Sequence, residues 1–196
     1  MLILIAIPYH EQKRYCLNEL FDWIRDADLS GSEILIRFHR GSYGEKDAVK
    51  KQREFFRQQA EKLGVDYLFF VGADTIPPLD VLPKLLARNV DVVGGVYYGR
   101  QGASNGNELT AVAWKHNQPE FNKRKNLEQL KGLVEVDGMG CDCLLLSKAV
   151  LNTSWLDWPQ TDDDYPFFDK LKEKGCKIWL DTEVVCKHYF DKDKYN

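Results

Sequence analysis

Apolar residues in the first hundred positions follow two alternating patterns. Short runs dominated by apolar residues predict strands, and four of them occur, at 2–7, 33–38, 67–71 and 90–98. Between the runs, apolar residues recur at helical spacing; the first such set is Leu17, Leu20, Phe21 and Ile24. This repeated strand–helix order predicts right-handed crossovers and a mostly parallel sheet.

The second predicted helix runs from about residue 47 to 63, and Gly64 after it is a typical helix stop. Its buried side is expected to include Val49 and Phe56. Pro83 fits the first turn of a third helix, because the N–H group that proline lacks has no helical partner there.

The pattern becomes less regular after residue 100. A polar loop rich in Gly, Asn and Ser occupies 100–108, and the charged segment 115–131 fits either a mobile lid or a solvated surface. Further strands are expected at 109–114, 133–137 and 141–146.

Composition fits one globular domain. The chain has 196 residues, of which 44% are hydrophobic, which is enough for one sizeable core. The net charge of −3 argues against an electrostatic nucleic-acid binder. The apolar start at 1–7 is too short for a signal peptide or a membrane span.

The cysteines favour a reducing environment. There are five, an odd number, and the closest pair is Cys141 and Cys143. Because no Cys-x-x-Cys pair occurs, a zinc site is not expected, and reduced thiols in a cytoplasmic protein are the simpler interpretation.

Asp74 follows the third apolar run in the stretch DYLFFVGADTIPP. Open α/β sheets bind ligands beyond the carboxyl ends of their strands, which makes Asp74 a candidate ligand-binding residue. The alternative is that Asp74 only caps the next turn. No Gly-x-Gly-x-x-Gly follows the first strand and no P-loop motif occurs, so dinucleotide-dehydrogenase and P-loop NTPase functions lose their main support.

Residues 66–98 resemble the central segment of a GT-A-fold glycosyltransferase of the family 2 type. In that family an apolar strand runs into an Asp-x-Asp motif, then a Pro-rich turn, a helix and a strand similar to 91–95. This chain has Gly72-Ala73-Asp74, so the first Asp of the motif is missing.

Three later stretches resemble the family in the expected order. Residues 137–146 are similar to its glycine-containing turn and strand beside the acceptor site, and 163–181 to its acidic pair, helix, glycine and strand. His188 falls where many of these enzymes carry a late histidine. The resemblance implies a GT-A-like three-layer α/β/α fold, with a mostly parallel sheet in the N-terminal half and a mixed C-terminal half.

The same resemblance implies a Mn²⁺ or Mg²⁺ ion held by Asp74 and His188. A carboxylate and a neutral imidazole can bind such an ion and leave positions for phosphate oxygens. The ion would neutralise charge on a departing diphosphate. Without the family, His188 would equally suit a surface position. If the missing Asp matters, the substitution Gly72→Asp should tighten metal-dependent nucleotide binding.

The acidic run at 162–164 precedes the last predicted helix. Inverting sugar transfer needs a base for the acceptor hydroxyl, and a carboxylate is the usual one. One Asp would suffice as a helix cap, and three adjacent like charges repel, which suggests that at least one has another use. By its register to Gly175, Asp164 is the expected base, with Asp163 orienting the acceptor.

The resemblance also implies which residues meet the substrates. The expected nucleotide-binding residues are Pro8, Tyr9, Glu11, His39, Arg40, Lys51, Gln52 and Ala73. The resemblance also places Gly140 beside the acceptor. Independently of the resemblance, Trp155 and Trp158 are candidates to stack on a sugar, although buried tryptophans would fit equally well. The second strand lacks the terminal Asp that normally reads a pyrimidine, so the base stays open, with UDP favoured.

The expected protein is therefore a single domain over 1–196, with a nucleotide-sugar-binding half at 1–100 and an acceptor and catalytic half at 101–196. Its expected function is metal-dependent transfer of a sugar, with inversion, to a hydroxyl of a glycan, lipid or protein. One alternative is a non-catalytic nucleotide-sugar or glycan-binding module. A weaker one is a nucleotidyltransferase, which would need an N-terminal Gly-rich loop with Arg and Lys that this chain lacks.

Overall fold

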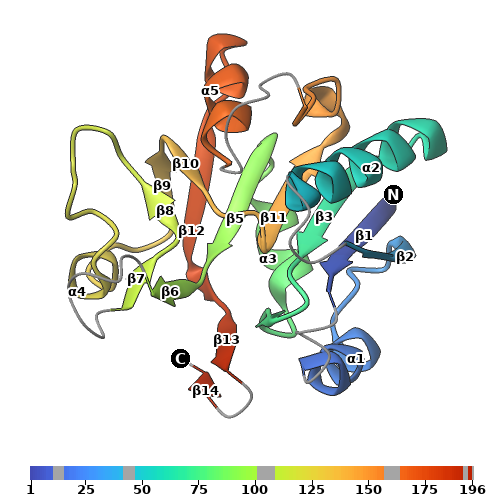
Figure 1. Ribbon diagram of the computed structural model, residues 1–196, viewed down its shortest axis with the longest axis horizontal. Helices are drawn as coiled ribbons and strands as arrows, with labels where there is room; N and C mark the ends of the chain where they lie inside the picture. Colours follow the sequence, from blue (N-terminus) through green and yellow to red (C-terminus); the bar gives the residue numbers. More distant parts are fainter. Residues whose placement is uncertain (11–15, 42–46, 101–108, 157–163, 192–193, 196) are drawn as a thin grey trace.

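A seven-stranded mixed sheet forms the centre of the protein (Figure 1). The computed structural model describes residues 1–10, 16–41, 47–100, 109–156, 164–191 and 194–195. The strand order is β2-β1-β3-β11-β5-β12-β9. Their bounds are β1 Leu2–Tyr9, β2 Glu33–Arg40, β3 Tyr67–Val71, β5 Val92–Val96, β9 Leu133–Val136, β11 Cys143–Ser147 and β12 Ile178–Val185.

Strand directions explain where a site can form. β1 runs parallel to both β2 and β3, and β5 runs parallel to β12. β11 lies between β3 and β5 and is antiparallel to both. The start of β11 therefore lies at the edge where β3 and β5 end, which is the carboxyl edge of the parallel strands.

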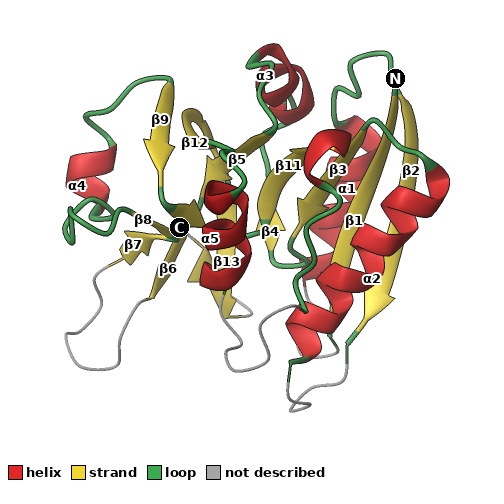
Figure 2. Cartoon of the chain, turned by 90° about the horizontal axis from the view of Figure 1, so that it is seen from above, coloured by secondary structure: helices red, strands yellow, loops and turns green. Residues whose placement is uncertain are grey.

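Helices cover both faces of the sheet. They are α1 Leu17–Asp26, α2 Ala48–Leu63, α3 Val81–Ala87, α4 Arg124–Leu127 and α5 Tyr165–Glu173, with the short 3₁₀ helix η2 at Lys148–Val150. Buried side chains of α2 and α5 pack against one face, and those of α1 and α3 against the other. Figure 2 shows α2 and α5 on the side of the sheet opposite α3. This is the three-layer α/β/α arrangement expected from the sequence.

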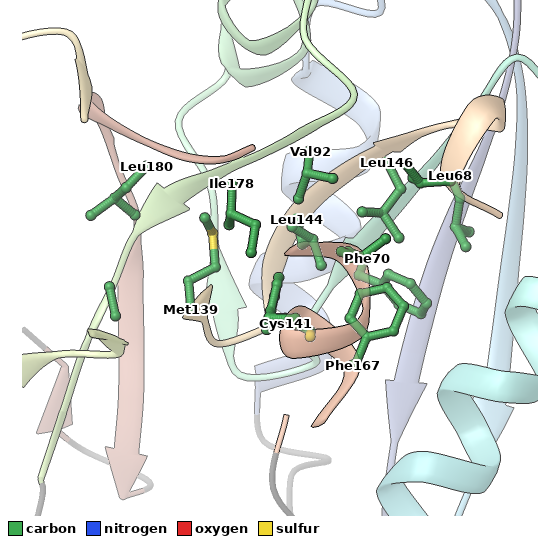
Figure 3. Close-up of a cluster of buried hydrophobic side chains, with 14 of the residues drawn as sticks. Leu68, Phe70, Val92, Met139, Cys141, Leu144, Leu146, Phe167, Ile178 and Leu180 are labelled. Carbon is green, nitrogen blue, oxygen red and sulfur yellow. The ribbon is translucent and has the colours of Figure 1, made fainter. Parts of the chain in front are cut away.

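The apolar runs supply both layers of the core. In β1, Leu4 belongs to the cluster beneath α2, whereas Ile5 belongs to the cluster beneath α1 and α3. The α2 side continues through Phe70 of β3 and Leu144 of β11 to Phe167 of α5 (Figure 3). Strands covered on both faces need apolar residues at successive positions, which is why these runs do not alternate.

Short strands extend the carboxyl edge. They are β4 Thr75–Ile76, β6 Tyr98–Arg100, β7 Leu109–Ala111, β8 Ala113–Trp114, β10 Gly138–Met139, β13 Lys187–Asp191 and β14 Lys194–Tyr195. β13 pairs with β4, so that His188 lies opposite Thr75. The C-terminal segment is thereby fixed beside the turn that follows β3.

Most predicted elements occur, with some differences in extent and burial. The run expected at 90–98 is divided into β5 and β6, and the one at 109–114 into β7 and β8. Phe21 and Val49, expected to be buried, are 50% and 45% exposed. The buried face of α2 instead includes the charged residues Arg53 and Glu54.

The charged segment 115–131 is neither wholly solvated nor without structure. It contains α4, and Phe121 and Leu127 are buried against the core on the α2 side of the sheet. The five cysteines are free thiols. None of the helices in the described part of the chain has the length and apolar character needed to span a membrane.

Candidate functional site

A cavity of about 140 Å³ lies at the carboxyl ends of β1 and β3. Its lining residues are Pro8, Tyr9, His10, Val49, Gln52, Arg53, Gly72, Ala73, Asp74 and Asp142. Four of the residues expected to bind a nucleotide, Pro8, Tyr9, Gln52 and Ala73, are among them. The cavity therefore lies where α/β sheets bind ligands.

Three side chains beside this cavity form a compact group of metal-binding type. Asp74, Asp142 and His188 each offer one ligand atom, and these atoms lie within 4.8 Å of one another. His188 Nε2 is 3.5 Å from Asp74 Oδ2, and both side chains are mostly buried. The structure thus brings together Asp74 and His188, residues 114 positions apart, and adds Asp142, which the sequence analysis did not single out.

Backbone pairing fixes the orientation of His188. Tyr189 N–H donates to the carbonyl oxygen of Asp74 at 2.9 Å, next to the β13–β4 pairing. His188 Nδ1 lies 2.7 Å from the carbonyl oxygen of Tyr98. Because a carbonyl can only accept, Nδ1 carries a proton in this contact, and Nε2 is the nitrogen that faces Asp74.

The charges around His188 outweigh its burial. Burial lowers the pKa of His188, but the hydrogen bond and charge of Asp74, the charge of Asp142 and the Tyr98 carbonyl raise it, and the net result is a pKa above the usual value. Two carboxylates facing one imidazole make this group favourable for positive charge. Carboxylate oxygens and an imidazole nitrogen suit Mn²⁺ or Mg²⁺, so the residues fit such an ion.

Asp164, the expected base, is connected to the same cavity through Arg53. It lies directly before α5, but its side chain makes no capping hydrogen bond to that helix. It forms an ion pair with Arg53 of α2, and the two side chains are 16% and 8% exposed. The structure therefore does not support capping as the role of the Asp164 side chain.

The other described residues of the expected nucleotide-binding set do not line the cavity, and Gln52 makes structural contacts in addition to lining it. Gln52 Nε2 donates to the carbonyl oxygens of Tyr9 and His39, at 3.2 and 2.6 Å, which ties α2 to the ends of β1 and β2. The His39 ring packs on Phe55, with centroids 4.3 Å apart. Arg40 and Lys51 are exposed side chains. His39, Arg40 and Lys51 do not line the cavity described above.

Two residues expected at the acceptor site are packing residues. Trp155 is 4% exposed and stacks on Phe167, with centroids 3.6 Å apart, so its faces are covered and the buried alternative holds. A Cβ atom at Gly140 would lie 1.7 Å from the Tyr97 hydroxyl oxygen, which explains a glycine there by close packing. Glu11, Asp163 and Trp158 are outside the described residues.

Sequence reasoning missed Asp142 and Arg53. The sequence did contain a signal for Arg53. Arg53 lies three residues before Phe56 and seven before Ala60, both fully buried, and this spacing puts all three residues on one face of the helix. A charged residue on that face needs a buried partner. Asp142 offered a weaker signal, as a single acid within the apolar stretch 141–146.

No family model matches the sequence, and no curated protein matches it. Among solved structures, the protein is similar to A197 from STIV, with 21% identity and a TM-score of 0.67, over 100% of this chain and 89% of A197. It is also similar to residues 1–349 of S. aureus TarS in complex with UDP-GlcNAc.

The match to that TarS complex has 14% identity and a TM-score of 0.56, and it covers 94% of this chain but only 58% of the TarS chain. The same TarS segment without UDP-GlcNAc gives a TM-score of 0.52 at 15% identity. At these identities the likeness concerns the arrangement of helices and strands. The protein thus has a mixed α/β fold of the GT-A-like type.

Proposed function

We propose that the protein is a metal-dependent glycosyltransferase of the family 2 type. It transfers a sugar from a nucleoside-diphosphate sugar, with UDP favoured, to a hydroxyl group, with inversion. The observation that carries this proposal is the group of Asp74, Asp142 and His188 at the carboxyl-edge cavity. The presence of UDP-GlcNAc in the similarly folded TarS structure supports the choice of donor.

Asp74 and His188 are the proposed holders of Mn²⁺ or Mg²⁺. When bound, the ion supplies positive charge that neutralises the departing diphosphate. The protein prepares this site in advance, since His188 is fixed by the Tyr98 carbonyl and by the pairing of β13 with β4. Side chains that are already oriented need no rearrangement when charge develops.

Arg53 and Tyr9 are the proposed contacts of the donor. Both line the cavity, and within the described structure the Nε atom of Arg53 has no hydrogen-bond partner. A guanidinium group binds phosphate oxygens through charge-assisted hydrogen bonds. The donor diphosphate would therefore satisfy the Arg53 Nε–H group, while the Tyr9 ring lies at the wall of the same cavity.

Asp164 is the proposed general base. Its carboxylate takes the proton of the acceptor hydroxyl while the hydroxyl oxygen attacks the anomeric carbon and the bond to the diphosphate breaks. The ion pair with Arg53 holds this carboxylate in place. Asp163 remains the proposed residue that orients the acceptor, which is a glycan, lipid or protein met by the half of the chain at 101–196.

A non-catalytic nucleotide-sugar-binding module is the second candidate. The Arg53–Asp164 ion pair favours it, because this pair already engages the carboxylate that would have to meet the acceptor hydroxyl. This alternative keeps the donor site and the metal and removes only the chemical step. Binding alone therefore does not distinguish the two functions, and turnover does.

The test combines binding and turnover. Mn²⁺ with UDP should raise the melting temperature of the wild type, because a ligand of the folded state stabilises it by mass action. Asp74→Ala and His188→Ala should each abolish this shift, whereas Asp80→Asn, at an exposed acid, should keep it. Slow hydrolysis of a UDP-sugar or GDP-sugar in Mn²⁺ would support the enzyme. Binding with no hydrolysis or transfer would favour the module, and unchanged shifts in both alanine variants would contradict the metal assignment.

A further inference from the structure

Gly72 and Asp142 compete for one space at the edge of the sheet. A Cβ atom at position 72 would lie 2.6 Å from Asp142 Cγ and 2.8 Å from both Asp142 Cβ and Oδ1. A real Cβ atom essentially never makes non-bonded contacts this short, and the Cβ of Asp142 is not the far end of a flexible side chain that could move aside. A side chain larger than hydrogen at position 72 therefore displaces the Asp142 carboxylate.

The backbone at Gly72 does not itself require glycine. The described glycines with positive φ are Gly31, Gly64, Gly132 and Gly175, and Gly72 is not among them. An L-amino acid could adopt its conformation, so the reason for glycine lies in the neighbouring side chain. That neighbour is Asp142.

Strand pairing places the two positions opposite each other. Val71 of β3 pairs with Cys143 of β11, and one residue further Gly72 N–H donates to the carbonyl oxygen of Asp142 at 3.0 Å. The turn after β3 and the start of β11 thus direct side chains into the same space. Only one of these two positions can carry a carboxylate.

The Asp142 carboxylate lies on the side of the cavity formed by Asp74 and His188. It lies within the 4.8 Å group with Asp74 and His188, and it lines the same cavity as Arg53. Arg53 is 7% exposed and, in the part of the chain described, its Nε has no hydrogen-bond partner. A buried donor with an open position beside these carboxylates points to a ligand that brings acceptor atoms of its own.

We infer that Asp142 is the third protein ligand of the ion, and that it replaces the carboxylate that position 72 lacks. This inference rests on the proposed function, because it specifies the metal site used there. The ligand set becomes two carboxylates from two different strand ends and one imidazole from β13. It also reverses the expectation that Gly72→Asp tightens binding, since the added side chain collides with the ligand already present.

Mn²⁺ titration of the full chain, followed by the electron paramagnetic resonance signal of free Mn²⁺, tests the ligand assignment. Asp142→Asn should weaken Mn²⁺ binding at least about tenfold, because even residues that only support a ligand cost about 10–100-fold when replaced. Asp74→Asn should weaken it comparably, and Asp80→Asn should leave it unchanged. Asparagine keeps the size of aspartate, so the fold is expected to persist, and circular dichroism checks that it does.

A reciprocal exchange tests the shared space. Asp142→Gly alone should lose Mn²⁺ affinity by about the same factor as Asp142→Asn. Gly72→Ala and Gly72→Asp should each weaken binding as well, although neither removes a ligand. Gly72→Asp combined with Asp142→Gly should regain affinity to within about threefold of the wild type. Gly72→Ala combined with Asp142→Gly should not, because it frees the space without a carboxylate.

The outcomes separate this inference from the proposed function. If Asp74→Asn loses Mn²⁺ and Asp142→Asn does not, the third-ligand assignment is overturned while the metal-dependent function stands. If the wild type binds no Mn²⁺, alone or with UDP, both fail. If both single Asn variants lose Mn²⁺ but the folded Gly72→Asp and Asp142→Gly double variant does not recover, Asp142 is a ligand and its equivalence to position 72 is overturned.

Discussion

Two buried groups of charged side chains meet on α2, and they differ in how completely they are satisfied. Glu54 accepts hydrogen bonds from Arg57, from Ser154 Oγ at 3.1 Å and from Trp155 N–H at 3.1 Å. Arg57 in turn donates to the Leu151 carbonyl oxygen at 2.7 Å. This Glu54 group ties α2 to the segment 151–155 and uses its bonding capacity within the protein.

Arg53, one residue before Glu54 on the helix, is as deeply buried as Arg57, but not all of its hydrogen-bond donors have partners. Its guanidinium pairs with Asp164 and lines the cavity, and its Nε has no hydrogen-bond partner within the described ranges. A saturated group such as that of Glu54 stabilises the fold, whereas an unsaturated one beside a cavity is ready for a ligand. A buried charge alone therefore does not identify a ligand-binding site. A buried charged group that lines a cavity and has a hydrogen-bond donor without a partner does.

The largest expected effect concerns Asp164, the partner of Arg53. Asp164→Asn keeps the size of the side chain but removes its ability to accept a proton, so sugar transfer should fall by about two to four orders of magnitude. Donor affinity should change by at most about tenfold, because Asp164 touches the donor site only through its ion pair with Arg53. Single-turnover transfer measured alongside donor affinity checks both. Asp162→Asn, from the same acidic run, is the control and should be nearly silent. Equal losses in Asp162→Asn, Asp163→Asn and Asp164→Asn would indicate a folding role.

The next largest effect is a loss of stability, and it concerns the Glu54 group, whose hydrogen bonds are made within the protein. Glu54→Gln removes the buried carboxylate partner of Arg57, which keeps only its ion pair with the exposed Glu61, and it should lower the free energy of unfolding by about 2 kcal/mol. Urea unfolding measures this loss. Mn²⁺ affinity should stay at the wild-type value, since Glu54 does not line the cavity described above. If Glu54→Gln instead lost Mn²⁺ affinity with little loss of stability, the Glu54 group would not be a structural group distinct from the ligand-binding Arg53.

The opposite result is expected for the neighbouring residue. Arg53→Gln removes the cation at the cavity, so donor affinity should fall about tenfold, the usual scale for one charge-assisted hydrogen bond. The free energy of unfolding should fall by only about 1 kcal/mol, because the Asp164 side chain is 16% exposed and water can solvate it once Arg53 is removed. Calorimetric titration with UDP and Mn²⁺ gives the affinity and urea unfolding the stability. A large stability loss with unchanged UDP affinity would place Arg53 with the structural group.

The sequence predicted the parts of the site that depend on local pattern. The apolar run of β3 ends just before Asp74, and this pattern alone placed Asp74 at the sheet edge. His188 came from its position relative to a family pattern. The sequence marked Asp142 only as a single acid in an apolar stretch. Its contact with Gly72 could not be predicted, because it requires that β11 be inserted antiparallel beside β3, a long-range pairing that periodicity does not encode.

The different roles of Arg53 and Glu54 were also beyond the sequence. Both occupy the buried face of α2, and adjacent charged residues in a helix give no local indication of which one finds a full set of partners. Glu54 is satisfied by residues about a hundred positions later, at Ser154 and Trp155. The fold class was easier, since the spacing of apolar runs sets it and tolerates errors such as the exposure of Phe21 and Val49.

The smallest expected effect is a pH dependence that the Glu54 group should show. Burial raises the pKa of Glu54, but the hydrogen bonds from Arg57 and Trp155 N–H and the charge of Arg57 lower it, and the net pKa lies below its usual value of 4.5. A carboxyl group with a lowered pKa in the folded state stabilises the protein fully above the unfolded pKa. This contribution is lost as the pH falls through the folded pKa.

The difference in unfolding free energy between the wild type and Glu54→Gln should therefore be constant from pH 7 to about 5 and become smaller below about 4.5. Urea unfolding of both proteins at matched pH values measures this difference. The effects of the other carboxyl groups on stability cancel, because the two proteins share those groups. A difference that stays constant down to pH 3 would mean that Glu54 is not held ionised by its partners, and the contrast with Arg53 would then rest on geometry alone.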